Sequence, residues 1–490
     1  MSLDPRTPVL VGVGAIHERV DDPRQASEPL DLMAAALERA ALDAGHPGLL
    51  AAVDTIWTPR GFWTYSNPGR LLAERFGAAN PRTVVAEIGV LQTTLLGAAA
   101  RALAEGKSEI AMIVGGEARD RSARLRRLGL SESMIVQSDC PPDEILRPAA
   151  EIISRLEVDL GWIAPTIQYA MIDNALRYQE RQSLADHRAE LGALWAGFNR
   201  VAVANPEAWN RAPMSPEAIV SPDESNRMLS FPYTRSLVSQ WNVNQAGGLI
   251  LCTLEKAHRL GLDPRQFVYP LVVVDSEDML TLSERRELWR SVGFMHAAAR
   301  ALSYLGLAID EVGHLELYSC FPAAVRVQQR EFGVASCRPV TETGGMTFAG
   351  GPLNNFTIQG WVKMVEVLRS DPGSSGLVSA VSGFLTKQGV SILGPEPTRP
   401  FLFDSVTAKA RADQARIDVE PDAEGRARVA AYTVIHARDA ASRVALICDF
   451  DERRRTLRVV ADPELAEEGT SSELCGREVE LGVGGAMRWF

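Results

Sequence analysis

The sequence contains no pair of closely spaced cysteines. Its six cysteines are scattered along 490 residues, whereas a zinc site or a disulfide framework places them at short, recognisable spacings. These residues are Cys140, Cys252, Cys320, Cys337, Cys448 and Cys475. We therefore expect mostly buried thiols and no metal site.

The sequence also lacks a long apolar run and an excess of basic charge. No run approaches the roughly 20 residues that a membrane-spanning helix needs, and the N-terminal "MSLDPRTPVLVG" has no basic region followed by an apolar one. The 51 basic and 62 acidic side chains give a net charge of −11, which repels nucleic acid at long range. These absences predict a cytoplasmic protein with neither a membrane nor a nucleic acid as its partner.

The composition is that of an ordinary globular protein. Hydrophobic residues make up 46% of the chain and charged residues 23%, which argues against extensive disorder. A chain of 490 residues is longer than one ordinary core and predicts two or three domains.

A helix followed by a strand occurs twice with the same pattern. Residues 31–45 place apolar residues on one helical face, end in a glycine and lead to a strand-like stretch at 51–58. Residues 294–306 and 312–319 repeat this order. The two stretches therefore read as copies of one unit.

The next unit is repeated as well. Residues 93–117 read as a helix rich in small residues, a polar turn and an apolar strand, and residues 356–383 have the same order and spacing. Alternating strands and helices predict mostly parallel, buried sheets whose ligands bind at the carboxyl ends of the strands. We expect two such halves, stacked around central helices.

Two further segments differ in character from the repeated halves. Residues 118–235 begin with an arginine-rich run and continue with amphipathic helical patterns, which is typical of an inserted lid or binding region. After the prolines of 392–400, short stretches such as 426–437 and 442–451 alternate between apolar and polar residues. They predict an antiparallel β-barrel or a small sandwich.

The stretch "AEIGVLQT" at 86–93 lies where a strand meets a helix. The free backbone N–H groups of such a turn often hold a nucleophile or an anion. This turn contains no cysteine, serine or histidine.

Several motifs resemble the thiolase superfamily over residues 8 to about 395. The similar segments are "PVLVGVGAIHE", "AEIGVLQTTLLGAAARALAEGKSEIAMIVGGEARDRS", "QWNVNQAGGLILCTLEKAHRLGL", "LELYSCFPAAV", "TETGGMTFAGGPLNNFTIQG" and "LVSAVSGFLTKQG". "ANPEAW", "NRMLSFPYTR" and "YSCFP" are more similar to the thiolase-like proteins of type 1, which are related to the sterol carrier protein thiolases and carry an additional C-terminal β domain.

The resemblance implies an α/β thiolase fold with two repeated βαβαβ halves in α/β/α/β/α layers. The N-terminal half would span 1–255 with an insertion at about 118–235, and the C-terminal half would span 256–397. An antiparallel β-barrel would follow at 398–490. Thiolases usually dimerise through the strand before the nucleophile loop, here 82–89, so both a homodimer and a monomer stay open.

The resemblance also locates the catalytic positions, where this chain departs from the family. The nucleophilic cysteine of a thiolase falls at or beside Glu87, its histidine at Gly351 and its second cysteine near Val381 or Ser382. The Asn-Glu-Ala-Phe motif falls on residues 318–321, where only Phe321 is retained. The resemblance thus implies a thiolase scaffold without the thiolase machinery, and no catalytic residue is assigned.

Some residues of these loops remain candidates for a site, each with a structural alternative. Cys320 would face the pocket but suits packing, and Glu87 would be a carboxylate held at a helix terminus. The candidate pocket-lining residues are Ile88, Gly89, Tyr318, Ser319, Phe321, Asn354, Asn355 and Lys387, although the two asparagines equally suit a helix cap. The candidates for gripping coenzyme A phosphates are Arg119, Arg121, Arg124, Arg126 and Arg127, which equally suit a solvated helix face.

Three functions follow from this sequence. The first is a protein that binds acyl-CoA or an acyl chain without thiolysis, with no other cofactor bound. The alternative is an active acyltransferase or carbon-carbon bond enzyme that uses a non-standard site or a partner subunit. The third is a subunit that only docks onto a protein partner.

Overall fold

The computed structural model describes residues 3–149, 151–277, 280–438, 442–482 and 486–490. Its first sheet has six strands in the order β1-β8-β4-β2-β3-β5. The strands are β1 (Pro8–His17), β2 (Thr55–Pro59), β3 (Arg82–Ala86), β4 (Ile110–Ala118), β5 (Glu144–Leu146) and β8 (Asn244–Thr253). Every residue of β4 and β8 is buried, as expected for strands that are covered on both faces.

The second sheet repeats the pairing of the first. Its order is β10-β11-β12-β9-β13, with β9 (Tyr269–Ser276), β10 (His314–Glu316), β11 (Gly376–Ser382), β12 (Lys387–Gly394) and β13 (Leu402–Ser405). The antiparallel pair of β9 with β12 copies that of β1 with β8, and the antiparallel pair of β11 with β12 copies that of β4 with β8. The parallel pair of β10 with β11 copies that of β2 with β4. The predicted internal repeat is confirmed.

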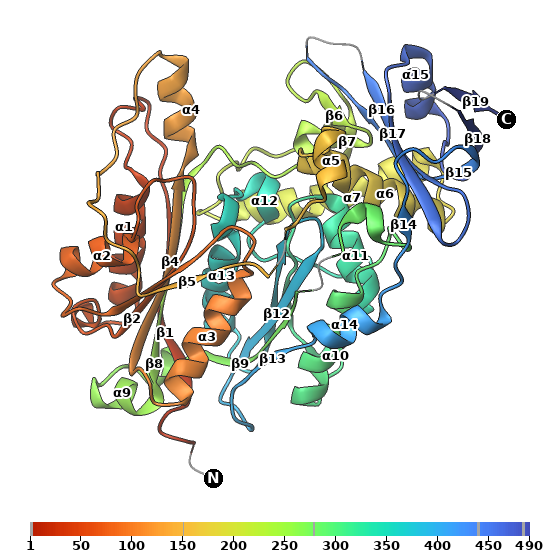
Figure 1. Ribbon diagram of the computed structural model, residues 1–490. Coiled ribbons are helices and arrows are strands. Elements are labelled where there is room, and N and C mark those ends of the chain that lie inside the picture. The colour runs from red at the N-terminus through yellow and green to blue at the C-terminus, as the bar shows by residue number, and fades with distance from the viewer. Residues whose placement is uncertain (1–2, 150, 278–279, 439–441, 483–485) are drawn as a thin grey trace.

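Two helices lie between the sheets and others cover the outer faces (Figure 1). The central helices are α3 (Gln92–Ala104) and α13 (Phe356–Ser370), and the outer helices are α1 (Pro29–Asp43), α2 (Pro68–Phe76), α9 (Leu254–Arg259), α10 (Val292–Leu305), α11 (Pro322–Phe332) and α14 (Thr407–Asp413). Small residues let α3 approach its neighbours, since a Cβ on Gly97 would lie 2.5 Å from the Phe403 ring. The predicted α/β/α/β/α layering is therefore confirmed.

The segment between β4 and β8 reaches across to the second half. Its remaining elements are α4 (Arg119–Arg127), α5 (Arg155–Asp159), α6 (Pro165–Gln179), α7 (Leu184–Ala204), α8 (Pro216–Val220), β6 (Met228–Ser230) and β7 (Tyr233–Thr234). Helix α6 packs against α11, and α7 packs against α12 (Gly345–Phe348). Parts of the chain that are far apart in sequence are thereby brought over the same end of the sheets.

The third sheet is formed mainly by the end of the chain. It contains β14 (Asp418–Val419), β15 (Gly425–Ile435), β16 (Arg443–Asp449), β17 (Arg454–Val460), β18 (Glu478–Leu481) and β19 (Met487–Trp489), with β6 and β7 attached to β15 and with α15 (Pro463–Ser471) against β15 and β16. The predicted barrel is not confirmed, because among the described residues no pairing joins the end strands β14 and β19. Both are short, and the sheet stays open.

Residues 402–413, which we assigned to the C-terminal domain, lie in the second half instead. Strand β13 pairs in parallel with β9, and α14 packs against α10. The apolar Leu402 and Phe403 complete the edge of the second sheet, so the C-terminal strands of the third sheet begin only at Asp418.

Strand β5 covers the edge of β3, the strand through which thiolases usually dimerise. It pairs in parallel with β3, and the Glu87 N–H donates to the Leu146 carbonyl at 2.9 Å. The Asp143 carboxylate accepts from the Thr83 N–H at 2.8 Å and from its hydroxyl at 2.9 Å. The backbone groups that a second copy would need are therefore already paired.

This covered edge predicts a monomer. Size-exclusion chromatography with light scattering is expected to give the chain mass of 53.3 kDa. Asp143→Ala, which removes the anchor on Thr83, is expected to raise the dimer fraction at high concentration, whereas Asp139→Ala at an exposed position nearby is not. A stable dimer of the unaltered chain would contradict this role of β5.

A buried carboxyl on β9 is attached to the first turn of the central helix α3. Asp275 accepts hydrogen bonds from the hydroxyl groups of Thr93 at 2.5 Å and Thr94 at 2.6 Å. Burial raises the pKa of Asp275 to about 7. The unfolded chain loses this proton near its ordinary pKa, so the side chain favours the folded state at low pH and loses that contribution as pH rises towards 7.

We therefore expect Asp275→Asn to gain stability relative to the unaltered protein as pH rises from 5 to 8. The introduced amide oxygen can accept a hydrogen bond from one threonine hydroxyl, and the amide nitrogen can donate one to the other. The amide carries no charge that burial would disfavour. The difference in the free energy of unfolding between the variant and the unaltered protein amounts to about 1.4 kcal/mol for each unit of pKa shift. Urea unfolding at each pH measures this difference. The exposed control Asp21→Asn should show no such trend, and a pH-independent difference for Asp275→Asn would reject this assignment.

Candidate functional site

A cavity of about 910 Å³ opens where the carboxyl ends of β3, β10 and β11 meet the inserted segment. Its lining residues are Ile88, Gly89, Ile152, Gly161, Ile163, Ala164, Pro165, Thr166, Tyr169, Leu229, Val238, Ser239, Trp241, Tyr318, Cys320, Phe321, Met346, Gly351, Leu353, Asn354, Val381, Ser382, Gly383 and Phe384. Most of these side chains are apolar, and no aspartate, glutamate, histidine, lysine or arginine lies among these described lining residues. The cavity therefore suits a hydrocarbon chain better than a charged group.

The turn at 86–93 contributes backbone and one apolar side chain to this cavity. Ile88 and Gly89 line it, and Gly89 has a φ of 104°, a conformation that favours glycine. Glu87 is absent from the lining, because its carboxylate forms an ion pair with Arg60 at 3.3 Å. Glu87, at or beside which the resemblance places the thiolase nucleophile, is therefore held by Arg60.

Lys387 supports this turn and does not line the cavity. Its side chain is fully buried, and the ammonium donates to the Gly89 carbonyl at 2.6 Å. Burial lowers the pKa of Lys387. Its place beneath the turn makes it a support for Gly89.

The loop after β10 provides the one thiol of the cavity. Tyr318, Cys320 and Phe321 line the cavity, whereas Ser319 is fully buried and accepts a hydrogen bond from the Met346 N–H at 3.1 Å. Burial raises the pKa of the Cys320 thiol to about 12. Cys320 is therefore protonated at neutral pH.

Stacked aromatic rings form the wall beside this thiol. The Phe321 ring lies between those of Tyr169 at 4.5 Å and Tyr233 at 5.6 Å. Tyr169 also donates from its hydroxyl to the Gly383 carbonyl at 3.1 Å. The insertion and the second half thus share one rigid wall.

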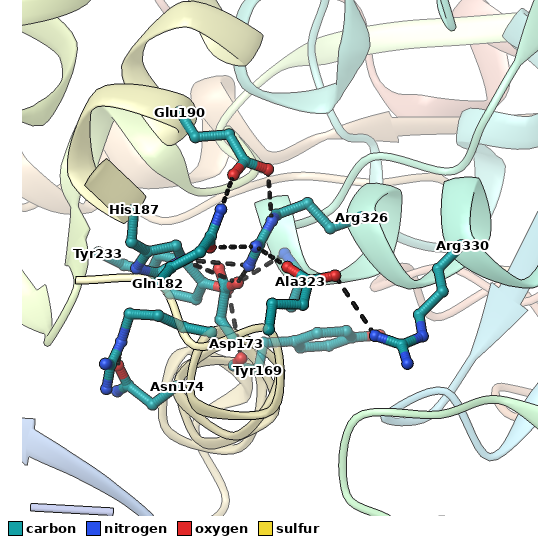
Figure 2. Close-up of polar contacts among 12 residues, drawn as sticks. Tyr169, Asp173, Asn174, Gln182, His187, Glu190, Tyr233, Ala323, Arg326 and Arg330 are labelled. Atoms are coloured by element: carbon teal, nitrogen blue, oxygen red, sulfur yellow. Dashed lines mark hydrogen bonds and ion pairs between the residues drawn. The ribbon is translucent and has the colours of Figure 1, made fainter. Parts of the chain in front are cut away.

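A buried ionic cluster lies behind the aromatic wall (Figure 2). The Tyr233 hydroxyl donates to Asp173 at 2.7 Å, and Asp173 also contacts Arg326 and, at 3.2 Å, His187. Although burial alone would raise it, Arg326 and His187 hold the pKa of Asp173 below its usual value. The cluster fixes Tyr233, and through it the wall.

Arg326 joins three elements in this cluster. It rises from α11 and reaches Glu180 at the end of α6 at 2.8 Å and Glu190 on α7 at 3.0 Å. Figure 2 shows the Arg326 guanidinium between Glu190 and Asp173. Since a buried charge is stable only when it is paired, α6 and α7 are held against α11.

The two asparagines that we selected play different parts. Asn354 lines the cavity, but its amide oxygen accepts from Gln92 and its amide nitrogen donates to the Arg60 carbonyl at 3.3 Å. Asn355 is buried away from the cavity, and neither of its side-chain polar atoms has a hydrogen-bond partner among the described residues. Neither amide points freely at a ligand. Gly351 and Ser382, to which the resemblance assigns the positions of the thiolase histidine and second cysteine, do line the cavity.

The five arginines of α4 have different surroundings. Arg121 is bound to Glu132 at 3.0 Å, and Arg124 donates to the Val20 carbonyl at 2.7 Å. Arg126 and Arg127 are exposed at the end of the helix. Arg119 alone among them stacks on a cavity residue, the Trp241 ring, at 5.1 Å.

Several lining residues were missed by sequence reasoning. Ile152, Ile163, Tyr169, Leu229 and Trp241 come from the insertion and its flank. Their sequence suggested a lid as a whole, but apolar residues carry no chemical signature that would single them out. They supply much of the apolar wall.

The described residues offer neither a metal site nor a membrane span. No group of three or more histidine, cysteine, aspartate and glutamate side chains in the described ranges is placed to hold a metal ion. Within the same ranges, no helix is long and apolar enough to cross a bilayer.

Several solved structures are similar to the structure of this chain. No protein-family model and no curated sequence matches it. An aldolase described as Ltp2-ChsH2(DUF35) has 18% identity and a TM-score of 0.61 over 80% of this chain and 98% of its own. The dimeric peroxisomal thiolase of Saccharomyces cerevisiae has 14% identity and a TM-score of 0.55 over 81% and 99%. These two likenesses show the fold alone.

A third structure matches from end to end. It is a monomeric SCP2-thiolase-like protein type 1 from Mycobacterium smegmatis, with 27% identity, a TM-score of 0.83 and coverage of 100% of both chains. The agreement includes the C-terminal sheet, which lies beyond the thiolase halves. The chain therefore has the thiolase fold and is similar over its full length to an SCP2-thiolase-like protein of type 1.

Proposed function

We propose that the chain binds an acyl chain, presented as acyl-CoA or as a free acyl compound, and does not cleave it by the thiolase reaction. The observation that carries this proposal is the apolar cavity of about 910 Å³, which is lined by loops to which the resemblance assigns the thiolase active site. Its volume lies in the range of small-molecule sites. The walls favour transfer of hydrocarbon from water.

The polar groups of the cavity support binding without thiolysis. A thiolase needs a thiolate nucleophile, and a cysteine is activated when its pKa is lowered by a helix terminus or by a cation. Here burial raises the pKa of Cys320 to about 12, and no histidine or carboxylate lies among the described lining residues to take its proton. The retained scaffold thus holds a ligand, while the means of attacking it are missing.

The first prediction from this proposal concerns chain length. Each buried CH₂ contributes about 0.8 kcal/mol, so the Kd is expected to fall about fourfold per added methylene from hexanoyl-CoA to decanoyl-CoA. Isothermal titration calorimetry measures this series, and an assay for free thiol is expected to detect no release of coenzyme A.

A matched pair of variants locates the binding. Ser382→Trp places a ring in the cavity and is expected to abolish the heat of acyl-CoA binding. Ser370→Trp, at the exposed far end of α13, is expected to leave the heat of binding unchanged. Absence of heat at every chain length, or full binding by Ser382→Trp, would refute the proposal.

A second candidate function is acyl transfer or carbon-carbon bond chemistry by a non-standard route. The Cys320 thiol lines the cavity together with Tyr169 and Tyr318, which would let it take up an acyl group if a substrate or partner activated it. The likeness in fold to a protein described as an aldolase adds this class to those worth testing.

Intact-mass spectrometry separates the two candidates. After incubation with octanoyl-CoA the mass of the chain is expected to stay unchanged, because a protonated thiol is a poor nucleophile. Cys337→Ala, which removes the exposed thiol, serves as the background so that surface acylation is not counted. An octanoyl adduct that forms there and disappears in the Cys320→Ala, Cys337→Ala double variant would favour the second candidate.

A further inference from the structure

The entrance of the cavity carries four large apolar side chains that water reaches. Phe62, Ile88, Ile163 and Trp241 are between 44% and 61% exposed, and all but Phe62 also line the cavity. Phe62 meets the Trp241 ring edge-on at 6.1 Å. Exposed apolar groups around a hollow are typical of a binding surface.

One cation lies within this apolar entrance. The Arg119 guanidinium stacks on the Phe62 ring at 4.4 Å and on the Trp241 ring at 5.1 Å. Its Nε is buried and has no hydrogen-bond partner among the described residues. No ion pair of Arg119 occurs in the described part of the chain, whereas nearby Arg60 and Arg121 are each paired with a glutamate.

The fold holds this arginine in position from two sides. Arg119 begins α4 directly after β4, and its N–H donates to the Val243 carbonyl at 2.9 Å. The buried Glu117 accepts a hydrogen bond from the Phe62 N–H at 2.9 Å and so holds the backbone at Phe62. Burial raises the pKa of Glu117 to about 7, and the hydrogen bond from the Phe62 N–H and the positive charge of Arg119 oppose this rise.

Stacking uses the faces of the guanidinium and leaves its edge for an anion. Arginine N–H groups form a fork that matches two oxygens of a carboxylate or a phosphate. Aromatic rings on its faces hold the group by cation–π attraction without using its donors. A cation that has no ion pair among the described residues and lies beside a hydrocarbon cavity suits a ligand that has both an anionic and an apolar part.

We propose that Arg119 is the anion anchor of the cavity, so that its ligands are amphiphiles with an apolar chain and a carboxylate or phosphate head. This inference rests on the proposed function, in which the cavity takes the chain. The inference adds to that function the chemistry of the ligand's head group and the residue that selects this head group.

Three ligands with the same chain test the anchor. Decanoate has a carboxylate, 1-decanol has no charge, and decanoyl-CoA has its phosphates far from the chain. Calorimetry of the full-length chain with Arg119→Gln is expected to show at least a tenfold loss of affinity for decanoate and less than a twofold change for 1-decanol. Arg265→Gln, at an exposed site after α9, is expected to change neither.

Arg119→Lys and the coenzyme A ligand refine the result. Lysine keeps the charge but lacks the fork, so it is expected to restore part of the decanoate affinity, which a merely structural role of Arg119 would not predict. A loss for decanoyl-CoA in Arg119→Gln as large as that for decanoate would identify phosphate as a head group as well, whereas a loss for decanoate alone would identify carboxylate.

Two outcomes would overturn the anchor. If all three ligands bind Arg119→Gln as they bind the unaltered chain, or if 1-decanol loses as much affinity as decanoate, Arg119 does not select the head group, while the proposed function stands. If the unaltered chain binds none of the three, both the anchor and the proposed function fail.

Discussion

The burial of two helices between two sheets is the constraint on which the rest of the structure depends. Helices α3 and α13 contact both sheets, so small residues such as Gly97 are needed where neighbours approach closely. This packing fixes where each central helix begins, next to the carboxyl ends of the strands. The turn at 86–93 and the loop at 351–355 therefore meet at one place, whatever side chains they carry, and the cavity is a consequence of the layering.

The cavity at the ends of the strands is lined mainly by apolar side chains. Thiolase chemistry needs a few polar groups at the strand ends, and here Glu87 is paired with Arg60 while Gly351 and Ser382 offer little chemistry. The second half and the insertion supply an aromatic wall instead, and the Asp173 cluster behind it joins α6, α7 and α11. A firmly supported apolar wall is consistent with selection for binding.

The periodicity of the sequence predicted two repeated halves stacked around central helices, and the resemblance to thiolases predicted the layers. Apolar spacing in 31–45 and 294–306 identified the repeat, because buried helical faces depend on local order. The positions of the loops also followed, but the direction of single side chains did not: Ser319, Asn355 and Lys387 point away from the cavity. The contact between Tyr169 and Phe321 joins segments that are distant in sequence, so the spacing of apolar residues along the chain does not predict it. Closure of the predicted barrel, which is not confirmed, could not be judged from the sequence for a related reason, since it depends on pairing between strands that are distant in sequence.

A structure of the chain with 10-bromodecanoate tests the central claim, that the cavity at the strand ends is an acyl-chain site, most directly. The anomalous signal of bromine marks the end of the chain without interpretation of weak density. We expect one strong peak inside the cavity near Phe321 and Val381, with the carboxylate at the entrance beside Arg119. A bromine peak in the groove next to α7 that Cys337 and Arg338 line, with none in the cavity, would contradict the account.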